Sequence, residues 1–129
     1  MSAYAFGKVV SHNYDDALKL ATDALAKEGF GVLTEIDVAA TMKKKLGKEM
    51  RPYKILGACN PNFAHRAIEA EPQIGALLPC NVVVRVDERG KTLVEIMDPN
   101  AVLQLVDRAD IGAIASEVRE KLQRVLASL

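Results

Sequence analysis

The chain has 129 residues, of which 50% are hydrophobic and 26% charged, the composition of one ordinary globular domain. Its 17 lysines and arginines balance 17 aspartates and glutamates, so it lacks the basic excess that drives binding to phosphate backbones. Nucleic acid is therefore not expected as its main partner. Folding at this length buries enough surface for a core without a metal or a disulfide, and we expect residues 1–129 to form a single domain.

The expected cellular location follows from the targeting and membrane-spanning segments that the sequence lacks. No basic segment followed by an apolar stretch and a cleavage site opens the chain, and no apolar run approaches the ~20 residues that cross a bilayer. Two cysteines do not make the disulfide framework of a small secreted domain. The sequence predicts a cytoplasmic protein with reduced thiols and no membrane partner.

The N-terminal part begins with a strand and a helix. Side chains alternate through residues 4–11, which predicts a strand. Asn13 then offers an N-cap, apolar residues follow at helical spacing, and Gly29 ends the helix. Residues 30–36 are the second predicted strand, and Asp37 is a suitable cap for a short helix. The first helix is amphipathic and should lie on an apolar surface.

The middle of the chain carries a strand that turns directly into a helix. Residues 53–59 are the third predicted strand, with Cys59 on the same face as Ile55. Asn60 and Pro61 then start a helix, because asparagine is a good cap and proline suits the first helical position. The strand therefore ends with a cysteine at the point where a helix begins.

The C-terminal part adds a hairpin and a long helix. Residues 80–87 and 91–97 are predicted strands joined by a tight turn. A short helical turn at 101–106 precedes the last helix, which Asp110 is predicted to cap. The elements favour a two-layer α+β fold, in which a five-stranded, mainly antiparallel sheet packs against long N- and C-terminal helices. The other sheet face should then be polar, or should be buried against a second copy.

The one dense positive cluster is Lys43, Lys44 and Lys45, with Lys48 and Arg51 nearby. Its simplest interpretation is a solvated helix face. A patch that docks an anion or a partner is the alternative.

Cys59 and Cys80 are the residues that could carry chemistry. Cys59 precedes a helix start, whose free amides and partial positive charge favour a thiolate. The simpler interpretation is that both are small apolar core residues, since each shares a strand face with apolar neighbours. If the third and fourth strands are adjacent and antiparallel, the two cysteines lie at the same sheet edge; after a parallel crossover they lie at opposite ends. The sequence leaves both open.

Metal binding and cofactors are not predicted. The cysteines are far apart with no C-x-x-C pair, and the only imidazoles are His12 and His65. His65 lies within one helical turn of Cys59 and could activate it as a nucleophile, although a surface histidine is the commoner outcome. The phosphate-loop, H-E-x-x-H and G-x-S-x-G motifs are absent from the sequence.

Two segments resemble the domain-of-unknown-function family 302: residues 54–61, Lys-Ile-Leu-Gly-Ala-Cys-Asn-Pro, and residues 78–82, Leu-Pro-Cys-Asn-Val. Residues 36–38, 45–47 and 97–99 also look like that family, so the resemblance covers nearly the whole chain. It implies a fold like that of the TATA-binding protein, in the order strand, helix, four strands, helix. It implies neither DNA binding nor an activity. The positions carried over are signature positions only: Cys59, Asn60, Pro61, Pro79 and Cys80.

Three functional hypotheses remain. The first is a small-ligand or protein binding module, working as a homodimer, whose site lies near two cysteines; its candidate binding residues are Cys59, Asn60, Pro61, His65 and Cys80. The second is a thiol-dependent redox or transfer protein with Cys59 as its candidate catalytic residue, so whether the protein is an enzyme stays open. The third is a purely structural partner protein.

Overall fold

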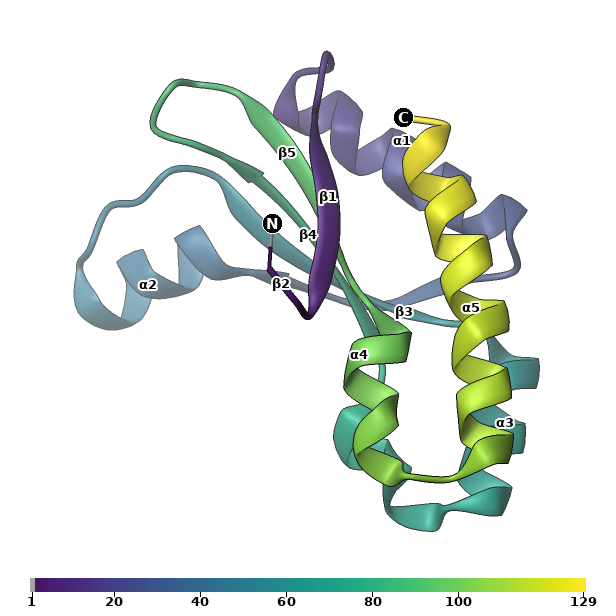
Figure 1. Ribbon diagram of the computed structural model, residues 1–129. Coiled ribbons are helices and arrows are strands. Elements are labelled where there is room, and N and C mark those ends of the chain that lie inside the picture. Colours follow the sequence, from purple (N-terminus) through teal and green to yellow (C-terminus); the bar gives the residue numbers. More distant parts are fainter. Residues whose placement is uncertain (1) are drawn as a thin grey trace.

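The protein is built on one five-stranded sheet, seen in a computed structural model that describes residues 2–129 (Figure 1). The strands are β1 (Ala5–Val10), β2 (Gly31–Asp37), β3 (Tyr53–Cys59), β4 (Cys80–Val86) and β5 (Thr92–Met97). Their order across the sheet is β1-β5-β4-β3-β2, and every neighbouring pair is antiparallel. The predicted α+β class, the strand count and the antiparallel sheet are confirmed.

Two long helices pack on one face of this sheet, a short helix lies on the other side beside β3, and further helices lie at one end of the sheet. They are α1 (Tyr14–Lys27), α2 (Val38–Leu46), α3 (Pro61–Ala70), α4 (Pro99–Leu103) and α5 (Ala109–Ala127), with 3-10 turns η1 (Pro72–Leu77) and η2 (Gln104–Val106). The long helices α1 and α5 lie on the same side of the sheet, and α3 and α4 lie near its lower end in the view of Figure 1. No helix in residues 2–129 is long and apolar enough to span a membrane.

Local signals place most helix ends. The Asn13 side chain accepts a hydrogen bond from the backbone N–H of Asp16 at 2.9 Å, and Asp37 does the same for Ala40. Gly47, with φ of 66°, ends α2 in the left-handed conformation that favours glycine. The predicted caps Asn13 and Asp37 are confirmed.

The predicted start of the last helix is wrong by two residues. Arg108 occupies the N-cap of α5, and Asp110 lies in its first turn, where its carboxylate accepts from the N–H of Ile111. The Asp110 side chain forms an ion pair with the side chain of the N-cap residue Arg108. The 3-10 turn η1 was also not predicted.

The core lies between the helices and the sheet face that carries Leu56 and Ala58, both 0% exposed. Tyr53 and Ile55 on the other face of β3 are only half-buried. The expectation that the strand face of Cys59 points at the core is therefore wrong, because the long helices α1 and α5 cover the opposite face of the sheet. Core positions opposite the sheet include Leu25, Ile111, Ile114, Leu122 and Val125.

Candidate functional site

The strand order brings the two cysteines to the same end of the sheet. β3 and β4 are adjacent and antiparallel, and Ala58 is the register partner of Cys80. Cys59 is the next residue along β3, so the two cysteines are diagonal neighbours on paired strands. The first of the two topologies left open by the sequence holds. The segment that joins β3 to β4 consists of α3 followed by η1, and it leaves and re-enters the sheet at this same end. Both cysteines are free thiols.

A pocket of about 360 Å³ opens beside the cysteines, between the end of the sheet and helices α3 and α5. Pockets of roughly 300–1,000 Å³ are the size that binds small molecules. Its lining includes Cys59 and Cys80 on the strands, Phe63, Ala64 and Ala67 on α3, Leu103 on α4, Ile114 and Val118 on α5, and Leu78 and Pro79 before β4. The polar side chains in the lining are Thr34 and Asn60, and it contains no charged residue among residues 2–129.

Cys80 forms part of the buried wall of this pocket. It is 7% exposed, and burial raises the pKa of its thiol to about 11, with a smaller contribution from nearby Cys59. Burial acts this way because a thiolate loses its hydration in an apolar surrounding. At neutral pH Cys80 is therefore a neutral thiol that contributes an apolar surface.

Cys59 and Asn60 lie at the start of α3 in a less buried setting. Asn60 is at the predicted N-cap position, but its side chain does not cap the helix. Its amide nitrogen instead lies 3.5 Å from the carbonyl oxygen of Glu28. Gly29 leaves room for this approach, because an added Cβ would lie 3.0 Å from that nitrogen. The first amides of α3 thus have no side-chain cap, and half-buried Cys59 directly precedes them.

The remaining candidate residues lie outside the pocket lining. His65 is exposed on α3, and its Nε2 is 3.1 Å from a carboxylate oxygen of Glu69. Pro61 is also exposed, and neither residue lines the pocket. The structure therefore brings together the two cysteines and Asn60, and it places His65 and Pro61 elsewhere.

The pocket walls were not identified from the sequence. Phe63, Ala64 and Ala67 belong to the apolar stripe of α3, and Ile114 and Val118 belong to that of α5. Each stripe indicates a buried helix face. An apolar stripe does not indicate how completely the facing surfaces fill the space between them. No sequence signal therefore distinguished residues that line the pocket from residues that are packed in the core.

Metal ligands do not converge at this site. Within residues 2–129, no three histidine, cysteine, aspartate or glutamate side chains lie together in a way that could hold a metal ion. The two cysteines by themselves fall short of the four ligands typical of structural zinc.

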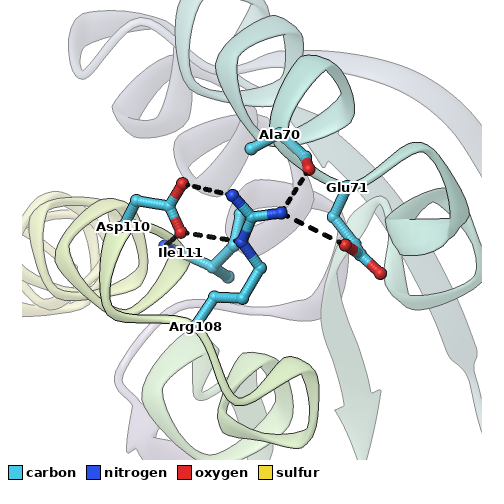
Figure 2. Close-up of polar contacts among 5 residues, drawn as sticks. All are labelled: Ala70, Glu71, Arg108, Asp110 and Ile111. Carbon is cyan, nitrogen blue, oxygen red and sulfur yellow. Dashed lines mark hydrogen bonds and ion pairs between the residues drawn. The ribbon is translucent and has the colours of Figure 1, made fainter.

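An arginine joins the two helical walls at their far end (Figure 2). Arg108 Nη1 donates to the carbonyl oxygen of Ala70 at 2.6 Å and lies 3.4 Å from a carboxylate oxygen of Glu71. Its Nε and Nη2 donate to Asp110 at 3.0 and 2.9 Å. These hydrogen bonds hold the pKa of the Asp110 carboxyl below its ordinary value. Arg108 therefore ties the end of α3 to the start of α5.

Replacing Arg108 with alanine is expected to loosen η1, because this substitution removes the link from α5 to the Ala70 carbonyl and Glu71. Hydrogen–deuterium exchange should become faster in residues 72–78, while the strands keep their protection. Arg89→Ala, at an exposed position in the β4–β5 turn, is the matched control and should leave this segment unchanged. Unchanged exchange in Arg108→Ala would show that the segment is held by its apolar contacts alone.

Comparisons with known proteins agree with this architecture. A family model described as "Domain of unknown function DUF302" matches residues 6–129. The chain is similar to the crystal structure of an uncharacterized conserved protein DUF302 from Bacillus stearothermophilus, with 26% identity, a TM-score of 0.90 and coverage of 98% of each chain. No curated protein matches the chain.

Proposed function

The chain belongs to the DUF302 family, whose description names no activity, and from the pocket we propose that it is a small-ligand binding module. The ligand lies between the end of the sheet and helices α3 and α5, beside Cys59 and Cys80. The observation that carries this proposal is a pocket of about 360 Å³ that contains both cysteines and Asn60.

The lining defines the class of ligand. Burying a charge without a partner is costly, and the lining contains no charged side chain within the described residues. A neutral, mainly apolar molecule is therefore favoured. The volume equals the space of about a dozen water molecules in the liquid, which suits a ligand of one to three rings. Asn60 and Thr34 offer hydrogen bonds to one polar group of that ligand.

The proposal is tested with N-phenyl-1-naphthylamine, a neutral apolar dye that fluoresces when it leaves water. The wild-type protein should bind it and raise its emission. Ala64→Phe should weaken binding at least about tenfold, because the larger side chain fills the pocket from α3.

The matched control is His65→Phe, which places the same phenylalanine side chain at the next residue of α3, at an exposed position outside the pocket. It should bind the dye as the wild type does. If the wild type binds no dye, or if Ala64→Phe binds as tightly as His65→Phe, the pocket is not a binding site of this kind.

A second candidate function is a thiol-dependent redox or transfer protein using Cys59. One observation favours it: Cys59 is not fully buried, lines the pocket and directly precedes helix amides that lack a side-chain cap. A helix start favours a thiolate. We give it second place because the neighbouring thiol, Cys80, is buried and holds its proton.

We also propose a reducing location, the cytoplasm, and a homodimer as the working form. Both cysteines are free thiols, which suits a reducing compartment. A second copy is supported by the part of the sheet face, over β1, β5 and β4, on which no helix of residues 2–129 lies.

A further inference from the structure

The short helix α2 and the loop that follows it form a projecting part of the molecule. Figure 1 shows the C-terminal end of α2 at the left edge of the molecule, apart from the other helices. No residue of α2 (Val38–Leu46) is buried, and its main packing partner is β3. Every residue from 43 to 52 is exposed. We call residues 43–52 the basic tip.

The basic tip carries a strong local positive charge. It contains one acidic residue, Glu49, and five basic ones: Lys43, Lys44, Lys45, Lys48 and Arg51. Lys43 Nζ lies 3.1 Å from a carboxylate oxygen of Glu49, and the tip keeps a net charge of +4. Because the whole chain is neutral, the remaining residues carry a net charge of −4. The molecule is therefore electrically polarised, and a negatively charged surface attracts it by this tip.

The dipole of α2 accounts for only part of the basic tip. Lysines in the last turn of a helix interact favourably with its partial negative charge, and three lysines occupy the last turn of α2. Lys48 and Arg51 lie beyond Gly47, the residue at which the helix ends. The positive charge therefore extends past the part of the chain that the helix dipole stabilises.

Two large apolar side chains are exposed among these charges. Leu46 is 65% and Met50 42% exposed, and each has basic residues within two positions along the chain. A solvated helix face needs neither of them. Apolar and basic side chains on one exposed segment are the combination that binds at the interface of a membrane, where charges meet the headgroups and apolar groups leave water.

We propose that the basic tip docks on a membrane surface that contains anionic lipids. The basic side chains lie at the headgroup phosphates, and Leu46 and Met50 enter the boundary between headgroups and acyl chains. The sequence predicts no membrane partner because it lacks a spanning segment, but a peripheral contact needs none. The inference goes beyond the pocket, and it agrees with the proposed cytoplasmic location because the cytoplasmic leaflet carries anionic lipids.

The size of the tip favours a lipid surface over a protein partner. A stable protein interface takes roughly 20–30 residues on each side, at least twice the length of residues 43–52. A lipid surface requires no matching shape, and each basic residue close to an anionic membrane strengthens binding by about fivefold. The contact should be reversible and sensitive to salt, since salt screens exposed charges.

Flotation of the full chain with lipid vesicles tests the proposal. Vesicles of equal parts phosphatidylglycerol and phosphatidylcholine should carry the wild-type protein at low salt, and vesicles of phosphatidylcholine alone should not. Raising NaCl from about 0.05 M to about 0.5 M should release the protein, because the Debye length shortens about threefold.

Two charge variants locate the contact. The tip variant combines Lys44→Glu, Lys45→Glu and Lys48→Glu. It should lower the vesicle-bound fraction at least about tenfold, because it makes the net charge of the tip negative. The matched control makes the same charge change at three exposed positions outside the tip: Lys27→Glu, Arg89→Glu and Lys91→Glu. The control should retain most of the wild-type binding, and equal losses in the two variants would overturn the assignment of the contact to the tip.

The apolar side chains distinguish a lipid surface from an acidic partner. A variant with Leu46→Ser and Met50→Ser, both at exposed positions, should bind the anionic vesicles at least about fivefold more weakly although its charge is unchanged. Wild-type binding in this variant would show recognition of charge alone and would overturn the lipid assignment. So would a wild-type protein that binds both kinds of vesicle equally, or one that binds poly-L-glutamate but no vesicles, the result expected for an acidic protein partner.

Discussion

Iodoacetamide is expected to modify Cys80 at least about a hundredfold more slowly in the folded protein than in the chain unfolded by urea. The thiolate is the reactive form. With its pKa raised from 9.0 to about 11, Cys80 is about one part in a thousand thiolate at pH 8, whereas a thiol with the ordinary value is about a tenth thiolate. Burial, which leaves 7% of Cys80 exposed, slows the reagent further.

The same experiment ranks the two cysteines. Half-buried Cys59 lines the pocket and should be alkylated well before Cys80. Mass spectrometry of the peptides that contain each cysteine, sampled over time, measures both alkylation rates in a single reaction. Cys59→Ser is the control and should leave only the slow reaction. Equal and slow modification of both cysteines in the folded protein would remove the thiol-dependent alternative, while the ligand-binding proposal would stand.

The free energy of unfolding is expected to fall by up to about 2–3 kcal/mol between about pH 9 and pH 11 because of Cys80 alone. The folded pKa of this thiol is raised from 9.0 to about 11. Above the unfolded pKa the unfolded chain releases the proton and the folded chain keeps it, so deprotonation favours the unfolded state. The stabilising contribution is complete below about pH 9 and is lost as the pH approaches the folded value.

Urea unfolding at a series of pH values measures this loss. Other groups also titrate in the alkaline range, so the informative quantity is the difference between the wild type and Cys80→Ala, a variant that is less stable at every pH because it leaves a small void. The wild type should lose more stability than Cys80→Ala on going to high pH. Parallel curves for the two proteins would mean that the thiolate is accommodated in the folded state, through solvent entering the pocket.

Local sequence signals were sufficient for most of the secondary structure. Asn13 and Asp37 cap their helices through bonds to backbone groups three residues away. Asp87 stabilises the turn of the β4–β5 hairpin, because its carboxylate accepts hydrogen bonds from the backbone N–H of Arg89 and of Lys91. Each of these contacts joins residues close in the chain, so the information needed to predict it lies within a few positions.

Predictions failed where a side chain has a distant partner. Arg108 reaches back to Ala70 and Glu71, and this contact accompanies an earlier start of α5 than Asp110 alone suggests. Asn60 behaves similarly, because it turns toward the Glu28 carbonyl instead of capping its own helix. Neither partner can be identified from nearby residues.

The sequence by itself determined the order of strands and helices, the α+β class and the position of Cys59 at the junction of a strand with a helix. It did so because alternation, helical spacing and capping are local properties. Only the tertiary structure decided which face of β3 is buried, that Ala58 lies opposite Cys80, and that α3 and α5 leave a pocket beside them. A strand pattern defines two faces without saying which one the helices cover. An apolar stripe requires burial without stating how much space remains, and both depend on residues that meet only after the chain has folded.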